Sequence, residues 1–367
     1  MKRKKVSELA KQIRGVSYKT EDLHENLDEN SVTLLRANNI FEGRINFDDV
    51  VYVDKSRVAR EQYLCKGDIL VCASSGSKQL VGKAASFNFD TECTFGAFCK
   101  VVRPNQDVAN YLSMYFQSNA YRRKISEVAI GANINNIRNE HIDALELPIG
   151  SNAENEKVVA SFSLLQQIID GRKQQLHKLD ELIKSRFIEL FGDPVINPKR
   201  FPCYTVGEVI DFQGGSQPDK KYFEYEASPD NIRLIQIRDY KSDKYITYIP
   251  KTMAKRFCTA DDIMIGRYGP PIFQILKGIE GSFNVALMKA TPKIGNKEFV
   301  RQFLKQDCLL EYLEGLSKRT AGQDGIQMDK LKAYPFPYPP IELQEQFAAF
   351  VEQTDKSKLC GKMGVAA

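Results

Sequence analysis

The sequence predicts an α+β fold: two similar mixed α/β domains separated by long antiparallel coiled-coil helices. Two observations predict this fold class. Segments from the first half of the 367-residue chain recur in the same order in the second half. An uninterrupted helical pattern, flanked by prolines, lies between the halves. We therefore expect a first domain at residues 1–150, a spacer helix at 151–192, a second domain at 193–340 and a second spacer helix at 341–367.

The internal repeat consists of four pairs of matching segments. They are VSEL at 6–9 with VGEV at 206–209, LLRANNI at 34–40 with LIQIRDY at 234–240, GDILV at 67–71 with DDIMI at 261–265, and FGAFCK at 95–100 with NVALMK at 284–289. Each match alone is weak, but their order is collinear and their offset changes only in small steps. The alternative is two unrelated α/β stretches that share common strand patterns.

Each half contains several short apolar runs followed by an amphipathic helical pattern. The runs are bounded by Gly, Ser and Asn, and predict strands at 50–53, 68–72, 234–237, 246–249 and 262–265. The helices are predicted at 108–128 and 297–317, and a short strand that ends in proline closes each half. Each half is therefore expected to form a domain of ordinary size.

The predicted spacer helix carries a heptad pattern. Apolar residues recur every seven positions from Phe162 to Leu190, which is typical of a coiled-coil seam. Glycine and then proline follow at 192–194 and are expected to end the helix. At about 1.5 Å per residue, this helix would be nearly 60 Å long.

An exposed apolar seam of this length is expected to have a partner helix. The segment 341–358 is the repeat counterpart of 153–169 and could pack antiparallel to the first helix, with Val351 among the contacts. The alternative is that the long helix packs on its own globular domain. The residues expected to pair the helices are Phe162, Leu165, Ile169, Leu176, Leu179, Ile183, Leu190, Leu343, Phe347 and Phe350.

Composition excludes few classes of protein. The net charge of +5 fits nucleic-acid binding, but many ordinary proteins share it. Eight cysteines without a CxxC pair, no apolar stretch of membrane-spanning length and a charged start without a signal peptide favour a reduced cytoplasmic protein that does not enter a membrane.

The sequence contains no recognisable catalytic or cofactor motif. The three histidines, His24, His141 and His177, lie far apart and lack metal-ligand spacing. Walker A, HExxH and GxSxG motifs are absent, and so is the Asn-Pro-Pro-aromatic tetrad of amino-methyltransferases. We therefore expect a non-enzymatic chain without cofactor or metal.

Two runs at the helix boundaries resemble a known family. The run KLDELIKSRFIELFGDPVINPK at 178–199 looks like the end of the central helix in type I restriction-modification DNA-specificity subunits, and PPIELQEQFAAFVEQTDKSK at 339–358 looks like the start of their second helix. The resemblance spans the whole chain: target-recognition domain, helix, target-recognition domain, helix.

The resemblance implies a role as a non-catalytic adaptor. Each target-recognition domain of such a subunit reads one half of a split, asymmetric target from the major groove of double-stranded DNA. The spacer fixes the gap and holds two methyltransferase subunits, which bind S-adenosylmethionine, and restriction subunits join that complex. One departure is expected here. The counterparts of residues 170–191 would begin at position 359, so the second helix is expected to be shortened.

Residues suited to base and phosphate contacts gather in three loop clusters of each half. Arg, Lys, Asn, Gln and Ser are the usual readers, and equivalent loop positions here are polar but differ in identity. The candidate DNA-binding residues are Arg36, Asn38, Asn39, Ser74, Ser75, Ser77, Lys78, Asn133, Asn135, Asn136 and Arg138 in the first half, and Gln236, Arg238, Tyr240, Arg267, Tyr268, Lys318, Arg319, Gln323, Asp324 and Gln327 in the second.

Two other functions stay open at this point. A fused restriction and methylation enzyme would need cofactor motifs that the sequence lacks. A protein-only helical scaffold would not show the fall of DNA affinity with salt that phosphate contacts cause.

Overall fold

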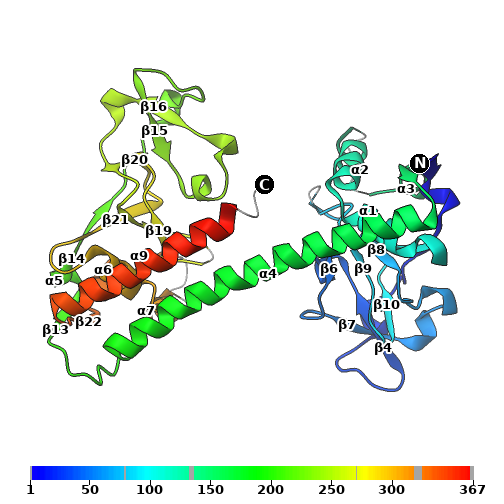
Figure 1. The fold of residues 1–367 in the computed structure, drawn as a ribbon, viewed down its shortest axis with the longest axis horizontal. Helices are drawn as coiled ribbons and strands as arrows, with labels where there is room; N and C mark the ends of the chain where they lie inside the picture. Colours follow the sequence, from blue (N-terminus) through cyan, green and yellow to red (C-terminus); the bar gives the residue numbers. More distant parts are fainter. Residues whose placement is uncertain (1, 78–79, 132–135, 270, 318–324, 364–367) are drawn as a thin grey trace. The chain divides into compact units, whose positions relative to one another are not determined.

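The computed structural model describes the chain except residues 1, 78–79, 132–135, 270, 318–324 and 364–367. The chain divides into two compact units, Met1–Ile168 and Ile169–Ala367. Helix α4 (Asn152–Phe191) continues unbroken from one unit into the other, as Figure 1 shows. The predicted fold class, with sheet-containing domains and a long helix between them, is confirmed. The four predicted segments stay predictions, because the division between the compact units falls inside α4.

Two four-stranded sheets form the first unit. One has the antiparallel order β2–β11–β8–β9 and the other the order β10–β4–β7–β3, in which only β10 and β4 are parallel. The strands are β2 (Ala10–Arg14), β11 (Cys99–Pro104), β8 (Ile69–Cys72), β9 (Ala84–Ser86), β10 (Cys93–Phe95), β4 (Ser31–Leu35), β7 (Val51–Asp54) and β3 (Leu23–His24), with the pairs β1 (Lys2–Lys5) and β12 (Glu146–Ile149), and β5 (Ile40–Phe41) and β6 (Arg44–Ile45).

The second unit has the same arrangement in its first sheet, and its second sheet differs only in the edge that carries the fourth strand. Its sheets have the orders β14–β21–β18–β19 and β16–β15–β20–β17, and β15 and β20 are again a parallel pair. The strands are β14 (Ile210–Gly214), β21 (Leu287–Pro292), β18 (Ile263–Gly266), β19 (Gln274–Lys277), β16 (Tyr248–Pro250), β15 (Asn231–Ile235), β20 (Gly281–Phe283) and β17 (Phe257–Cys258), with the pair β13 (Cys203–Thr205) and β22 (Pro335–Pro337). The five strands expected from the sequence are present, and their ends differ from the predicted ones by at most three residues.

Each helix predicted within a domain is two helices in the structure. Helices α1 (Ala109–Gln117) and α2 (Asn119–Gly131) break at Ser118, whose hydroxyl donates to Tyr115 O at 2.7 Å and accepts from Tyr121 N at 3.2 Å. In the second unit α6 (Lys297–Leu304) and α7 (Asp307–Ser317) break at the equivalent place. The amphipathic pattern continues through a capped break, which is why it predicts one helix. The remaining short helices are α3 (Asn139–Asp143), α5 (Val206–Val209) and α8 (Met328–Ala333).

The central strand of each unit packs on two layers at once. In β8, Ile69 and Val71 belong to the hydrophobic cluster that includes the helices, whereas Leu70 and Cys72 belong to the cluster shared with the second sheet. In β18, Ile263 and Ile265 likewise face the helical cluster, and Met264 faces the other. Alternate side chains of a strand point to opposite faces, so both faces of this sheet are buried.

The two units repeat one framework of backbone hydrogen bonds. The N–H of Val6 donates to Leu145 O and that of Val206 to Tyr334 O, both at 2.9 Å. The bond from Gly96 N to Leu35 O in the first unit matches the bond from Asn284 N to Ile235 O in the second. In the same way, the bond from Ala73 N to Phe98 O matches the bond from Arg267 N to Ala286 O. These bonds correct one detail of the repeat. In the structure Gly96 corresponds to Asn284. The predicted match of 95–100 with 284–289, which pairs Lys100 with Lys289, is therefore shifted by one residue.

One glycine in each unit allows two backbone segments to approach closely. A Cβ at Gly15 would collide with the carbonyl of Gly96, and a Cβ at Gly215 would collide with the carbonyl of Asn284. Val16 N donates to Phe95 O and Ser216 N to Phe283 O at the same places. Neither position therefore tolerates a side chain without movement of the backbone.

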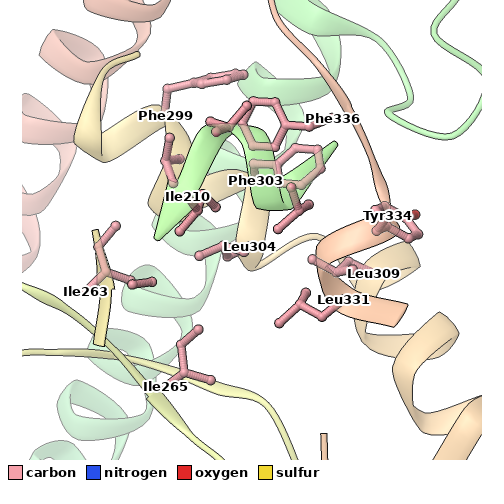
Figure 2. Packing of buried hydrophobic residues seen from close by; sticks show 14 of the residues in the cluster. Ile210, Ile263, Ile265, Phe299, Phe303, Leu304, Leu309, Leu331, Tyr334 and Phe336 are labelled. Atoms are coloured by element: carbon pink, nitrogen blue, oxygen red, sulfur yellow. The ribbon is translucent and has the colours of Figure 1, made fainter. Parts of the chain in front are cut away.

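The C-terminal part of α4 is a core element of the second unit. Ile183, Phe187 and Phe191 belong to its hydrophobic cluster, together with Phe347 and Val351 of α9 (Ile341–Met363). Phe187 lies 5.6 Å from the Phe347 ring and 5.7 Å from the Phe299 ring, centroid to centroid. Figure 2 shows the neighbouring part of this core, where Phe303 packs 4.1 Å from Phe336.

Helices α4 and α9 run antiparallel along this stretch. Phe347, near the start of α9, contacts Phe187 and Phe191, whereas Lys358 forms an ion pair of 2.7 Å with Asp180, earlier in α4. Leu190, Leu343 and Phe350 pack partly buried against the same cluster.

The rest of the heptad seam is more exposed. Leu165 is 59% exposed, while Phe162, Ile169, Leu176 and Leu179 are half-buried. Leu164 and Ile168 add further exposed apolar surface to the same helix. Helix α4 therefore has no continuous buried seam from Phe162 to Leu190. Only its last turns carry the aromatic residues that fill the core.

Replacing Phe187 by alanine should lower the free energy of unfolding by about 3–5 kcal/mol, because it removes a buried ring that contacts three others. Urea denaturation followed by circular dichroism measures the loss. Leu165→Ala, on the same helix but exposed, is the control and should change stability by less than about 0.5 kcal/mol. Equal effects of the two variants would contradict this packing.

Two Gly→Ala substitutions should change the stability of the protein in opposite directions. Gly215→Ala should destabilise by about 1–3 kcal/mol because the new methyl collides with backbone. Gly171→Ala, in the interior of α4 with open space around it, should stabilise by about 1 kcal/mol, since alanine is the better helix former. Thermal unfolding of both variants checks the signs, and a stabilised Gly215→Ala protein would refute the close approach.

Candidate nucleic-acid interface

A cavity of about 530 Å³ in the first unit collects residues from separate loops. Four of the candidate DNA-binding residues line it, namely Arg36, Asn38, Ser74 and Ser75. The remaining lining residues come from 16–18, from Ala37 and Gly76, and from 96–99. The structure thus brings two of the three predicted loop clusters to one place.

Backbone hydrogen bonds tie the third cluster to the same place. Ser74 forms a β-bridge with Asn136, and Ile137 N donates to Ala73 O at 2.7 Å. On its other side, the loop after β8 is bonded to the loop after β10, because Ser74 N donates to Phe98 O at 3.0 Å. Main chain rather than side chains therefore sets the positions of these loops.

Asp49 interacts with two of the candidate DNA-binding side chains, Arg36 and Asn38. Its carboxylate lies 3.1 Å from the guanidinium of Arg36 and accepts a hydrogen bond of 2.6 Å from the Asn38 amide. Both side chains remain at the surface, and the Arg36 Nε atom is buried without a partner among the described residues. Asp49 therefore restricts the directions that these donors can take, which favours a defined acceptor pattern.

Asn39 has a different role from the predicted one. Its side chain is fully buried, its amide donates to Asn46 O at 3.1 Å and Asp49 O at 3.2 Å, and its Oδ1 accepts from Arg36 N at 2.8 Å. These bonds close the turn that presents Arg36 and Asn38. Because no polar atom of Asn39 reaches the surface, it is left out of the candidate interface.

The second unit presents a matching set with different side chains. Gln236 and Arg238 both donate to Thr247 Oγ1, at 3.1 and 3.0 Å, and about half of the Arg238 side chain is exposed. Tyr268 forms a β-bridge with Gly325, as Ser74 does with Asn136. The guanidinium of Arg267 lies 5.3 Å from the Tyr268 ring centroid.

Tyr240 belongs to the core rather than to the surface. It packs against the cluster of Ile235, Met264 and Phe283, and burial raises the pKa of its hydroxyl above the ordinary value. Its counterpart Ile40 is buried as well. Tyr240 is therefore also left out of the candidate interface.

The other candidates divide into two groups. Ser77, Asn136 and Arg138 are exposed, and Gln327 is half-buried and donates to Leu316 O at 3.4 Å. Outside the described residues lie Lys78, Asn133, Asn135, Lys318, Arg319, Gln323 and Asp324.

Several aromatic residues beside the polar loops were not among the sequence-based candidates. Tyr18 and Phe98 line the cavity of the first unit. In the second unit Tyr225 and Tyr245 line a surface hollow of about 620 Å³ together with Arg238 and Lys244. The signal that could have identified Phe98 is its place in a glycine-containing turn between two strands, where an apolar side chain has no core to enter.

No group of three or more His, Cys, Asp and Glu suited to a metal ion occurs in the described part of the chain. His24 lies between Asp28 and Asp54, at 2.8 and 3.5 Å, and its hydrogen bond to Asp28 raises the pKa of its imidazole. Burial raises the pKa of the Cys93 thiol to about 12 and leaves it poorly nucleophilic. Among the described helices, none is long and apolar enough to cross a membrane.

Comparison with known proteins identifies the family. A model described as the type I restriction modification DNA specificity domain matches residues 198–360. The specificity subunit of the type I restriction enzyme StySPI from Salmonella potsdam is 38% identical over 379 residues, which cover 95% of this chain and 80% of that protein. The chain belongs to the specificity subunits of type I restriction enzymes.

Other relatives agree with this membership. The EcoKI specificity subunit of Escherichia coli (strain K12) is 27% identical over 382 residues and matches the same shares of both chains. Two solved structures share the fold at 15% identity: a chain of a type I R-M system with a TM-score of 0.53, and the S subunit from M. genitalium with a TM-score of 0.50. Each covers 100% of this chain and 92% of its own.

The neighbours Asn38 and Asn39 should respond differently to alanine substitution. Asn39→Ala should lower the free energy of unfolding by about 1–3 kcal/mol, because the turn loses the three hydrogen bonds of a fully buried side chain. Asn38→Ala serves as the matched control and should leave stability within about 0.5 kcal/mol. Urea denaturation of both variants measures the difference, and an Asn39→Ala protein as stable as the parent would show that the turn does not need this amide.

Proposed function

We propose that this chain reads the DNA target of its restriction-modification complex, with each unit contacting one half of a bipartite, asymmetric sequence. The observation that supports this most is the repeated loop framework with different side chains on it. Arg36 corresponds to Gln236, Asn38 to Arg238 and Ser74 to Tyr268. Two equal frameworks with unequal donors and acceptors would select two different half-sites.

The exposed side chains suit recognition in the major groove. An arginine can bind guanine O6 and N7, and an asparagine or glutamine can bind adenine N6 and N7. Asp49 and Thr247 orient these donors from behind while the side chains stay accessible. Holding the donors in place before binding reduces the entropy that binding would otherwise cost.

The chain is proposed to be non-catalytic and to need no cofactor or metal of its own. Methylation and cleavage would be carried out by methyltransferase and restriction subunits, and S-adenosylmethionine would bind the methyltransferase. The exposed apolar side chains of α4, Leu164, Leu165 and Ile168, support its use as a docking helix for methyltransferase subunits, two per chain. A DNA-modifying complex of this kind would act in the cytoplasm.

Methylome sequencing tests the proposal directly. A host that lacks other such systems receives this chain together with its methyltransferase partner. We expect methylated adenines or cytosines within one split motif. Methylation that is absent, or that follows no motif, would refute DNA reading.

A binding experiment separates the proposal from its alternatives. The complex should bind the motif duplex with an affinity that falls as salt rises, because phosphate contacts release counterions. A protein-only scaffold would show no such binding. Crosslinking of labelled S-adenosylmethionine to this chain, rather than to its partner, would favour a fused enzyme instead.

Arg238→Ala should weaken binding of the specific duplex by about 1–3 kcal/mol if its guanidinium contacts a base. The loss should be confined to duplexes with the correct base at one position of the second half-site. Competition binding with single-base variants of the motif measures it. A phosphate contact would instead lower affinity evenly for all duplexes, and an unchanged base preference would remove Arg238 from the interface.

A further inference from the structure

One exposed aromatic side chain stands at the same place in each unit but comes from a different loop. Phe98 is 72% exposed in the first unit and Tyr268 is 47% exposed in the second. Phe98 lies in the loop between β10 and β11, whereas Tyr268 follows β18. In the repeat, the position of Phe98 holds Ala286 and the position of Tyr268 holds Ser74.

The two loops are held together by the same backbone bonds in both units. Ala73 N donates to Phe98 O and Arg267 N donates to Ala286 O, each at 2.9 Å. The loop pair therefore forms one surface element, and an aromatic ring can be supplied from either side of it. In the second unit the exposed ring at this element comes from the opposite loop.

Neither ring contributes to a core. Phe98 and Tyr268 are absent from the hydrophobic clusters of the described residues. Single exposed apolar residues are common and need no explanation on their own. Here the exposed ring recurs at one element of a duplicated framework, and in the first unit it borders the cavity that also collects Arg36 and Asn38.

The surroundings combine apolar surface with hydrogen-bond donors. Tyr18, Val16 and Ala97 line the cavity beside Phe98, and Ser74 and Ser75 supply hydroxyl groups. In the second unit, Val285 is exposed next to Ala286 and the Arg267 guanidinium lies over the Tyr268 ring. Donors read the polar edge of a base pair, whereas an apolar ring beside them fits the one apolar group in the major groove, the 5-methyl of thymine.

We propose that Phe98 and Tyr268 are specificity-determining residues that cover the 5-methyl group of a thymine, Phe98 in one half of the target and Tyr268 in the other. This inference rests on the proposed function, because it needs a DNA duplex at the loops. It adds the chemical feature recognised and the residue that recognises it in each half.

The test uses the full chain in complex with its methyltransferase and the motif duplex found by methylome sequencing. Each thymine of the motif is replaced in turn by uracil, which removes only the methyl group. At one thymine in each half, we expect binding to weaken about three- to tenfold, as the loss of one buried methyl implies. Phe98→Ala should abolish the difference between thymine and uracil in the first half and leave the second half unchanged.

Tyr268→Ala is the matched control and should show the reverse pattern. A loss of thymine preference in the second half, with the preference in the first half unchanged, excludes a general loss of folding as the cause. Tyr268→Phe keeps the ring and should retain the preference for thymine. Thermal unfolding of each variant confirms that the chain remains folded.

The outcomes separate this inference from the proposed function. A wild-type complex that binds no motif refutes the proposed function itself. A complex that reads a split motif but has no thymine in one half, or does not distinguish thymine from uracil there, overturns the inference alone. A thymine preference that persists in both halves after Phe98→Ala and Tyr268→Ala overturns it as well.

Discussion

The close approach of two backbone segments at Gly15 and at Gly215 is the constraint on which the loops of each unit depend. At Gly15 the chain leaves β2 and is bonded to the end of β10, which is in turn bonded to the end of β4. The two sheets of the unit are thereby joined at the base of the polar loops. Because the glycine lacks a Cβ, carbonyl groups can occupy the space that a side chain would fill.

A framework made of main-chain bonds separates the position of a loop from the identity of its side chains. The bonds of Ala73 and Arg267 are equivalent although one residue is small and apolar and the other long and charged. Buried polar groups such as Asn39 and Asp239 close the turns, and the residues around them are free to differ. This arrangement suits a protein in which the surface must vary while the fold stays the same.

The sequence predicted the duplication and the long helix well because both depend on patterns of apolar residues. The matches of VSEL with VGEV and of LLRANNI with LIQIRDY lie in equivalent elements of the two units. The breaks at Ser118 and between α6 and α7 were not predicted, because the apolar periodicity continues through both. At Ser118 a hydroxyl group caps the break. The length of the buried seam of α4 was overestimated for a related reason. A heptad spacing does not tell which turns of the helix pack against a partner.

Site residues were predicted less well, because polarity alone does not tell whether a side chain is exposed. Asn39 and Asn38 are neighbours of the same type, yet one is buried in a turn and the other faces outward. Tyr240 was predicted to bind DNA but packs against the core at the position of Ile40. Phe98 was not among the predicted residues, because base and phosphate contacts suggest hydrogen-bonding side chains. Its place in a turn between two strands and its exposure in the fold distinguish it from a core phenylalanine.

The duplication also bears on how such a protein can change over generations. Each set of loops is fixed by hydrogen bonds within its own unit, so a mutation in one set leaves the other set's scaffold intact. Under the proposed function, a lineage could alter half of its DNA preference in a single step while inheriting the remainder unchanged.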